Sequence, residues 1–389
     1  MHILVVPSAY PTEDAPLRSS FFKEQAIAVK NAGNKVGVIY SETRRVTGVN
    51  KNTIRKNHFQ ISDNCEEGIN TIRLHGWNIL LMRNSLGINL WVRQSIKLFE
   101  MYIKKYGIPD IIHVHCGLYG GLVGKAIKEK YSIPYIITEH SSIVMNHKVN
   151  IYNKEILKKV YNDADALISV GSKLKNAMEV YTNKKIVVIP NIVNTSIFNY
   201  IESNEPRSFK FISISNLKLS KRVNLTIEAF SQEFKGENVE LIIIGDGPEK
   251  EKLINLCEKL NIKEQVKFLG AVERFNINKH LNSSSAFVLP SSFETFGIVY
   301  IEALSCGLPI IATKCGGPED FFEESMGYLI EVDDLGALCK SMRRMIENYN
   351  HFNKREISNY IKRKFSEEIV VKKIDSIYRE VLNCKLINT

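Results

Sequence analysis

The strongest constraint on the fold is an alternation of short apolar segments with amphipathic ones, which runs through both halves of the chain. Short β-branched runs predict strands, and apolar residues at helical spacing predict helices. Strands are expected at 2–6, 36–40, 111–115, 135–138, 166–170, 186–189, 209–215, 239–244, 266–269, 286–289 and 309–312. Helices are expected near 20–32, 90–106, 118–130, 151–162, 172–181, 222–234, 248–260, 275–282 and 297–305. This alternation, occurring twice, predicts an α/β protein with two doubly wound, Rossmann-like domains, each a parallel sheet with helices on both faces.

The boundary between the domains is expected in the polar, asparagine-rich segment 191–208. We therefore place one domain at 1–193 and the other at 194–365, which agrees with a length of 389 residues at about 150 residues per domain. A final amphipathic helix is expected over 366–389, with Ser366 as its N-cap. Ligands of open parallel sheets bind beyond the carboxyl ends of the strands, so two sheets facing across a cleft would hold a ligand there.

Composition excludes several classes of protein. No run approaches the roughly 18 consecutive apolar residues of a membrane-spanning helix. The apolar N-terminus has no basic region before it and predicts a first strand rather than a signal peptide. The seven cysteines form no Cys-x-x-Cys pair, which argues against a disulfide framework and a zinc site and favours the reducing cytoplasm.

The positive charge of the chain is concentrated in its first half. The net charge is +10, and residues 1–193 hold 26 basic and 15 acidic residues, a net of +11. The rest of the chain holds 26 basic and 27 acidic residues, a net of −1. A basic domain attracts an acidic partner, such as a nucleic acid, an anionic membrane surface or a phosphorylated substrate.

The segment 290–317 carries the most chemical information. A strand ends before it, a loop holds Glu294, and a helix is expected to begin near Gly297. The backbone N–H groups of Phe296, Gly297 and Ile298 would form an anion site at the positive end of the helix dipole. Glycine at 297 allows a phosphate to approach without meeting a Cβ.

Glu302 follows in the same helix, where nearly all of its neighbours are apolar. A carboxylate in that position is costly unless a group donates hydrogen bonds to it. A vicinal diol, such as the ribose of a nucleotide, is the natural donor. Glu294, placed before the helix, would point toward whatever is attached to the phosphates.

The two glutamates form the Glu-x7-Glu signature that glycosyltransferase family 4 carries, and the chain resembles this family over nearly its whole length. Further matching landmarks are Pro109–His115, Thr138–Ser141, Ile189–Asn191, Gly245–Pro248, Phe268–Gly270, Pro290–Ser291, Phe296–Gly297, Cys306–Pro309 and Gly316–Gly317. The resemblance implies the GT-B fold, with acceptor binding by the domain at 1–193 and nucleotide-sugar binding by the domain at 194–365. It also implies that the final helix, 366–389, crosses back to the first domain.

The resemblance assigns roles to individual residues. It implies that Glu302 binds the ribose of the donor and that Glu294 binds a hydroxyl of the transferred sugar. It places His140 near the anomeric centre and the phosphate, where a histidine can donate to a hydroxyl or a phosphate oxygen. We also expect His115 and Asn191 to contact substrate.

The phosphate clamp departs from the family pattern. Lys221 aligns with the lysine of the family, but Asn216 stands where the family has an arginine, so Lys218 or Arg222 would supply the second charge. The glycine-rich loop of the first domain is replaced by 18–20, where Ser20 would approach the phosphate and Arg18 would assist. With Lys221 and a helix terminus on the diphosphate, neither a metal nor a cofactor is required.

Two other patterns could indicate a metal site, but each also has a structural interpretation, and we favour the structural one. His113 and His115 alternate on one strand and could bind a metal, but packing or lining of the cleft is the simpler interpretation. Asp163 and Asp165 imitate a metal motif of the other large glycosyltransferase fold, but they end a helix before a strand.

Two groups of glycines also have both a ligand-binding and a structural interpretation. Gly245 and Gly247 are half of a dinucleotide fingerprint and favour a turn between strand and helix close to the donor. A glycine set in the first half favours close packing of a helix on a strand over phosphate binding, and its members are Gly117, Gly120, Gly121 and Gly124. Within 77–106, the later helix is expected to be buried, and 77–88 is the better candidate for contact with a membrane surface.

The sequence predicts a retaining glycosyltransferase that transfers a hexosyl or N-acetylhexosaminyl group from a nucleoside-diphosphate sugar, with UDP as the favoured nucleotide. The acceptor would be a glycan or a lipid-linked molecule of bacterial surface polysaccharide or lipopolysaccharide biosynthesis. The enzyme would be cytoplasmic and peripheral on the inner face of the membrane. The sugar, base, acceptor, linkage and oligomeric state are left open. The alternatives are a non-hydrolysing sugar-nucleotide epimerase of the same fold and a basic nucleic-acid-binding protein, although no nucleic-acid-binding module is recognised.

Overall fold

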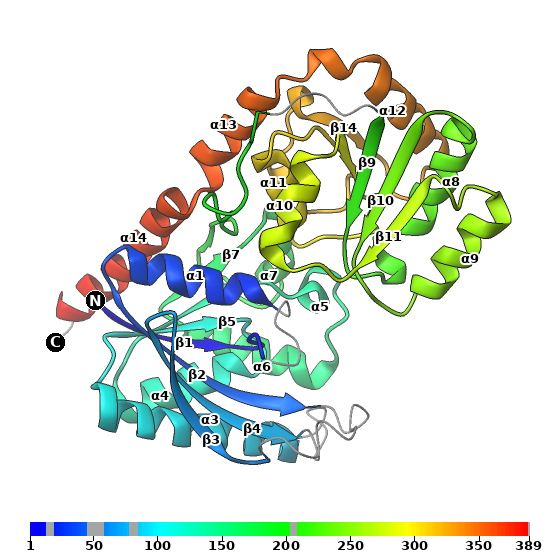
Figure 1. The fold of residues 1–389 in the computed structure, drawn as a ribbon. Helices are drawn as coiled ribbons and strands as arrows, with labels where there is room; N and C mark the ends of the chain where they lie inside the picture. Colours follow the sequence, from blue (N-terminus) through cyan, green and yellow to red (C-terminus); the bar gives the residue numbers. More distant parts are fainter. Residues whose placement is uncertain (13–18, 45–57, 78–84, 203–207, 388–389) are drawn as a thin grey trace. The chain divides into compact units, whose positions relative to one another are not determined.

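The computed structural model describes residues 1–12, 19–44, 58–77, 85–202 and 208–387. The chain divides into two compact units, unit 1 (Met1–Pro190 with Val370–Thr389) and unit 2 (Asn191–Ile369). Each is a parallel α/β unit and is described by itself (Figure 1). The boundaries fall a few residues from the predicted 193 and 365, because the backbone of Val193 pairs with Phe365 and Ser366 inside unit 2.

Unit 1 contains an eight-stranded sheet in the order β3-β4-β2-β1-β5-β6-β7-β8. Its strands are β1 (His2–Pro7), β2 (Lys35–Arg44), β3 (Ile61–Glu66), β4 (Ile69–Trp77), β5 (Ile111–His115), β6 (Tyr135–Glu139), β7 (Ala166–Ser169) and β8 (Ile186–Val188). All neighbours are parallel except β3 and β4. The prediction missed this antiparallel hairpin. Its turn is made by Glu67 and Gly68, both with positive φ, as a tight hairpin requires.

Helices cover both faces of this sheet. They are α1 (Ser20–Asn31), α3 (Ser85–Tyr106), α4 (Gly120–Tyr131), α5 (Ser142–Met145), α6 (Ile151–Asp163), α7 (Ser172–Glu179) and α14 (Glu367–Ile387). Successive side chains of a strand point to opposite faces. On β5, Val114 therefore meets α4, where a Cβ on Gly120 would lie 2.9 Å from it, while His113 meets Tyr378 of α14 on the other face. In Figure 1, α14, in red, runs beside α1, in blue, and Asn34 just after α1 bonds to Asp375 of α14.

The structural interpretations of the first half are confirmed where the structure tests them. A Cβ on Gly121 would lie 2.8 Å from Val160, and a Cβ on Gly124 would lie 2.6 Å from the ring of Tyr135, so both glycines permit close packing of α4. The predicted burial of the later helix is also confirmed, with Trp91, Leu98 and Phe99 of α3 in the core.

The aspartate pair is structural, as predicted. Asp163 Oδ1 lies 2.8 Å from Lys125 Nζ, and Asp165 Oδ1 lies 2.8 Å from Lys128 Nζ. Asp165 also accepts the backbone N–H of Tyr135 at 2.9 Å and so joins the end of α6 to the start of β6.

Unit 2 contains a six-stranded, wholly parallel sheet in the order β11-β10-β9-β12-β13-β14. Its strands are β9 (Phe209–Ile214), β10 (Val239–Ile244), β11 (Val266–Gly270), β12 (Ala286–Val288), β13 (Ile310–Thr313) and β14 (Gly327–Ile330). Its α-helices are α8 (Val223–Phe234), α9 (Lys250–Leu260), α10 (Arg274–Asn282), α11 (Ile298–Ser305), α12 (Leu335–Glu347) and α13 (Lys354–Phe365). The prediction did not include β14, α12 or α13.

The order of the strands indicates where a ligand would bind in each unit. In unit 2 the order reverses between β9 and β12, and in unit 1 it reverses between β1 and β5. Loops leave such a switch point in opposite directions and open a crevice at the carboxyl ends of the two strands. The loops that follow β9 and β12 contain Lys221 and Glu294.

All seven cysteines lie in the described ranges, and no disulfide joins any two of them. Within the described ranges, no helix is both long and apolar enough to cross a bilayer.

Candidate active site

Lys221 and Glu294 meet at the switch point of unit 2. Lys221 ends the short 3-10 helix η2 (Leu219–Lys221) after β9, and its Nζ lies 2.6 Å from Glu294 Oε1. The Ser291 hydroxyl donates to the same oxygen at 2.8 Å, and the Thr313 hydroxyl donates to the backbone carbonyl of Ser291 at 2.5 Å. Both charged side chains are mostly buried, so the loop after β12 holds the carboxylate in a fixed position beside the cation.

Glu302 is the buried carboxylate of α11, with 4% of its surface exposed. Its Oε1 lies 2.5 Å from Arg274, which begins α10. The Arg274 guanidinium also lies over the ring of Phe198, with 5.0 Å between the guanidinium carbon and the ring centroid. A buried carboxylate needs such a partner. Arg274 was not predicted as this partner, because it lies on another helix, 28 residues before Glu302 in the chain.

The N-terminus of α11 has the geometry expected of an anion site. Gly297 has a φ of 90°, a left-handed conformation that glycine adopts without strain, and the helix starts at Ile298. Phe296 is buried and packs against the rings of Phe321 and Phe365. A Cβ on Gly317 would lie 2.2 Å from the Phe296 carbonyl, so this loop packs tightly beneath the helix terminus.

The predicted phosphate clamp of Lys218, Lys221 and Arg222 does not assemble as a set around Glu294. Arg222 instead binds Asp333 in a bidentate pair, at 2.7 and 3.1 Å. Lys218 is exposed and lines a separate cavity of 450 Å³ together with residues of α9. Of the three predicted clamp residues, Lys221 alone pairs with Glu294.

Gly247 lies in the turn between β10 and α9, which packs on the loop after β9. A Cβ there would lie 2.4 Å from the carbonyl of Leu217, and a Cβ on Gly245 would lie 1.8 Å from the carbonyl of Ser215. The predicted turn is therefore confirmed, and both glycines are required by close approach of two backbones. 

In unit 1, three histidines gather at the carboxyl ends of β5 and β6. His115 Nδ1 lies 3.1 Å from His140 Nε2, and the rings of His113 and His115 are stacked with centroids 4.4 Å apart. Both nitrogens of His113 are bonded to hydroxyls, Nδ1 to Tyr378 at 2.6 Å and Nε2 to Thr138 at 2.8 Å. These hydroxyl partners support the packing interpretation of His113 over a metal site.

Burial keeps these imidazoles neutral near pH 7. It lowers the pKa of His113 to about 3, and burial, with a smaller contribution from His113, lowers the pKa of His140 to about 3. Burial also lowers the pKa of His115 well below its ordinary value, and the neighbouring His113 and His140 add to the effect.

Glu139 holds the loop on which His140 lies. This carboxylate is fully buried, and its Oε1 accepts the backbone N–H groups of His140 at 3.0 Å and Ser141 at 2.9 Å. Its Oε2 accepts the Tyr161 hydroxyl at 2.5 Å and the N–H of Gly117 at 2.9 Å. Sequence reasoning passed over Glu139, although the buried strand that ends in it already indicated an unusual carboxylate.

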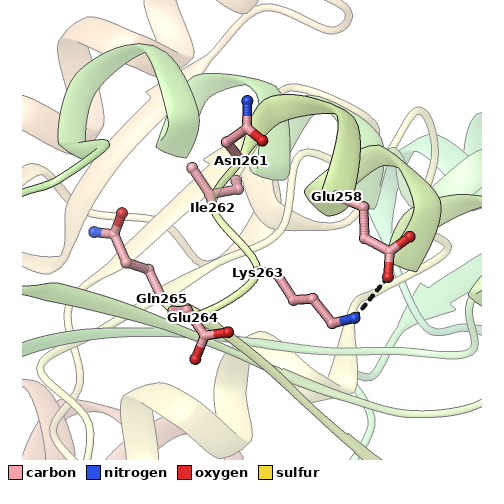
Figure 2. A pocket seen from close by; sticks show the side chains of 6 residues that line it. All are labelled: Glu258, Asn261, Ile262, Lys263, Glu264 and Gln265. Atoms are coloured by element: carbon pink, nitrogen blue, oxygen red, sulfur yellow. Dashed lines mark hydrogen bonds and ion pairs between the residues drawn. The ribbon is translucent and has the colours of Figure 1, made fainter.

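A further cavity, of 390 Å³, lies at the connection between α9 and β11 (Figure 2). Figure 2 shows its polar lining, with Lys263 and Glu258 paired at 2.7 Å. It shares no residue with the sites described above.

Two family models match the chain in succession. The model described as Glycosyltransferase Family 4 matches residues 21–197, and the model described as Glycosyl transferases group 1 matches residues 197–364. The chain belongs to glycosyltransferase family 4.

Relatives of this glycosyltransferase span most of its length. An uncharacterized glycosyltransferase of Methanocaldococcus jannaschii is 28% identical over 83% of this chain and 90% of its own. A putative teichuronic acid biosynthesis glycosyltransferase, TuaC of Bacillus subtilis, is 24% identical over 88% of this chain and 89% of its own.

Solved structures identify the fold of the glycosyltransferase. A sucrose-phosphate synthase from Thermosynechococcus elongatus matches with a TM-score of 0.81 at 19% identity, covering 99% of this chain and all (100%) of its own. HepE of Anabaena, solved with UDP and glucose, matches with a TM-score of 0.73 at 16% identity, covering 98% of this chain and 100% of its own. The predicted GT-B fold, with two parallel-sheet α/β domains, is therefore confirmed.

The remaining predicted residues of the glycosyltransferase are placed as follows. Arg18 lies outside the described residues. Ser20 begins α1 directly after Ser19, whose φ of 54° is in the left-handed region that a glycine of the family loop would favour. His115 has 1% of its surface exposed, and Asn191 is also buried and begins unit 2 rather than ending unit 1.

Proposed function

We propose that this glycosyltransferase transfers a hexosyl or N-acetylhexosaminyl group from a UDP-sugar to a glycan or lipid-linked acceptor, with retention of the anomeric configuration. The observation that carries the proposal is the convergence of Lys221, Glu294 and the N-terminus of α11 at the switch point of unit 2. Unit 2 is the donor-binding domain in this proposal, and unit 1 is the acceptor-binding domain.

The chemistry of unit 2 suits a nucleoside-diphosphate sugar. The Lys221 ammonium and the N–H groups at the start of α11 supply positive charge to the departing diphosphate. Glu302 accepts the two hydroxyls of the ribose, and Glu294 accepts a hydroxyl of the sugar. With Lys221 and the N-terminus of α11 assigned to the diphosphate, the proposal includes no metal. The UDP found in HepE, which has this fold, supports the choice of nucleotide.

We place the reaction in bacterial surface polysaccharide biosynthesis, on the cytoplasmic face of the membrane. The support is the relative named for teichuronic acid biosynthesis and the +11 charge of residues 1–193, which suits an acceptor presented beside anionic head groups. The predicted membrane contacts at 77–88 fall mostly outside the described residues.

The first test identifies the donor by its effect on thermal stability. A ligand that binds the native state raises the melting temperature of the protein. The protein is heated with UDP, GDP, ADP and their sugars, and UDP with one UDP-sugar is expected to stabilise it most. The stabilising sugar is then supplied with candidate glycan and lipid-linked acceptors, and the anomeric configuration of the product is read by NMR.

Three results would contradict the proposal. A modified nucleotide sugar formed without any acceptor indicates the epimerase. Inversion at the anomeric carbon removes the retaining mechanism. Salt-dependent binding to random DNA, with no stabilisation by any nucleotide sugar, indicates the nucleic-acid-binding protein.

A further inference from the structure

The ion pair of Arg274 and Glu302 spans the switch point of unit 2. Arg274 is the first residue of α10, which follows β11, and Glu302 lies in α11, which follows β12. In the sheet, β10 and β9 lie between these two strands. The pair therefore joins two connections that leave the carboxyl edge of the sheet on opposite sides of the switch point, where a ligand of such a sheet binds.

The guanidinium group of Arg274 is held by two contacts. Its Nη2 donates to Glu302 Oε1 at 2.5 Å, and its guanidinium carbon lies 5.0 Å from the centroid of the Phe198 ring, which is fully buried. A planar guanidinium pairs with a carboxylate and stacks on an aromatic ring, whereas the compact ammonium group of lysine offers no such plane. Arg274 is therefore fixed, and it holds the Glu302 carboxylate in one orientation.

Stability alone does not account for this pair. Apart from Glu302, the residues of α11 are all uncharged and most of them are apolar. Taking two charges out of water often costs as much as their mutual attraction returns, and apolar residues of similar volume commonly give equal or greater stability. In a helix that is already apolar, the buried charge is better explained by a ligand that needs a carboxylate.

We propose that Arg274 is a positioning residue for the donor, which fixes the Glu302 carboxylate for the ribose and thereby raises the affinity for the nucleotide. This inference rests on the proposed function, because it takes Glu302 to be the acceptor of the ribose hydroxyls. A cation beside a carboxylate favours its ionised form, which only accepts hydrogen bonds, as two donating hydroxyls require. An acceptor that is fixed before the ligand arrives also saves the entropy of ordering it.

The test compares UDP with a dideoxy analogue of UDP that lacks both ribose hydroxyls. Arg274→Gln removes the cation and keeps a planar amide. Its Kd for UDP, measured by calorimetry, should rise by about tenfold, because hydrogen bonds to a charged acceptor are weakened rather than removed. Its Kd for the analogue should not change, because the analogue makes no bond to Glu302. An unchanged Kd for UDP, or an equal rise for both ligands, overturns the proposal.

Arg343 provides a matched control within unit 2. Its Nη2 lies 2.9 Å from Glu237 Oε1, and its guanidinium carbon lies 4.5 Å from the centroid of the Phe234 ring. These contacts lie at the end of α8, which leads to the start of β10 and so to the opposite edge of the sheet. Arg343→Gln loses the same kinds of contact but should bind UDP as the unaltered protein does. An equal loss of UDP affinity in both variants overturns the proposal.

Two further variants keep the test decisive if Arg274→Gln does not fold. Arg274→Lys keeps the cation but loses the planar contact, and it should weaken UDP by about threefold without affecting the analogue. In Glu302→Gln the carboxylate is already absent, so adding Arg274→Gln should cause almost no further loss of UDP affinity. A second loss of about tenfold in that double variant would show that Arg274 does not act through Glu302, and would overturn the proposal.

Kinetics distinguishes positioning from a part in the chemical step. Contacts to the ribose are the same in the ground state and the transition state, so Arg274→Gln should raise the KM for the donor and leave kcat unchanged. A fall in kcat with an unchanged KM overturns the positioning role. If the unaltered protein binds no nucleotide, the proposed function fails and this inference fails with it. If it binds UDP and Arg274→Gln binds UDP equally well, the inference alone fails.

Discussion

At the scale of single residues, unit 2 pairs each of its two site carboxylates with one cation. Lys221 pairs with Glu294, and Arg274 pairs with Glu302. Both carboxylates follow β12, whereas Lys221 follows β9 and Arg274 follows β11, so each pair ties together two parts of the sheet edge. Removing one member of such a pair leaves a largely buried charge without a partner, which is strongly destabilising.

Two adjacent cations give a matched comparison for the phosphate clamp. Lys221→Ala should weaken binding of UDP by about tenfold to a hundredfold, because a charge-assisted hydrogen bond contributes about 1.5–3 kcal/mol. Arg222→Ala should change it by less than about threefold, because Asp333 already holds the guanidinium at the surface. Isothermal titration calorimetry measures both. The assignment of Lys221 is wrong if the two variants bind UDP equally well.

The ribose assignment rests on Glu302. Glu302→Ala should weaken UDP binding by roughly thirtyfold, about 2 kcal/mol, because the diol loses its acceptor. Calorimetry with UDP and with uracil, which lacks the ribose, separates the contribution of the ribose from that of the base. In Glu302→Ala the affinity for UDP should fall and the affinity for uracil should not change. Melting temperatures of Glu302→Ala and Glu302→Gln check that the loss of the Arg274 pair has not unfolded unit 2. Unchanged UDP affinity in a folded variant would refute the ribose role.

At the scale of elements, the ends of β5 and β6 carry three neutral histidines, of which His113 and His115 are buried and His140 is half-buried. Burial lowers the pKa of His113 and His140 to about 3, from an ordinary value of 6.5. Between these values the unfolded chain binds protons that the folded chain does not, so unfolding becomes more favourable as the pH falls below 6.5. Their full contribution to stability is present above pH 6.5 and is lost toward pH 3.

Unit 1 should therefore lose stability between pH 7 and pH 5. Below pH 6.5, the free energy of unfolding should fall by about 1.4 kcal/mol per pH unit for each histidine whose pKa is strongly lowered. Both tryptophans of the chain, Trp77 and Trp91, lie in unit 1, so tryptophan fluorescence follows its unfolding in urea. Carboxylates with ordinary pKa values stay largely ionised over this interval, so they contribute little. Equal urea midpoints at pH 7 and pH 5 would contradict the prediction.

Sequence patterns revealed the buried parallel strands, because continuous apolar runs between helices have few other interpretations. They did not reveal β3, because its residues are mostly polar and exposed at the sheet edge. The hairpin signal was nevertheless present in Glu67-Gly68, followed by the alternating residues of β4. In the site, the glutamates and Lys221 were predictable from local spacing and resemblance. Arg274 and the pairing of Arg222 with Asp333 were not, because each depends on contacts between distant segments.

At the scale of the whole molecule, the two units are expected to divide the substrates between them. UDP should slow hydrogen exchange of backbone amides at 296–298 and at 245–247 in unit 2. It should leave 166–169 of unit 1, which form β7, unchanged. Hydrogen-exchange mass spectrometry with and without UDP makes the comparison, and protection confined to unit 1 would reverse the proposed roles.

Contact with a membrane is expected to depend on the basic charge of unit 1. Replacing Arg44, Arg45, Lys51, Arg55 and Lys56 by alanine should reduce sedimentation with anionic vesicles, since each basic residue near the surface contributes about 1 kcal/mol. Apart from Arg44 these residues lie outside the described ranges. Neutral vesicles serve as the control, and unchanged sedimentation with anionic vesicles would remove the membrane from the proposal.

Because α14 belongs to unit 1, the order in which the ribosome delivers the chain matters. Residues 1–190 emerge first, but Tyr378, the buried partner of His113, emerges only after the whole of unit 2. At about 5–20 residues per second, unit 1 waits roughly ten to forty seconds for its last helix, while unit 2 is continuous and can fold as it emerges. During synthesis the apolar surface that α14 later covers is open to solvent, so unit 1 is the part of the nascent chain that most needs a chaperone.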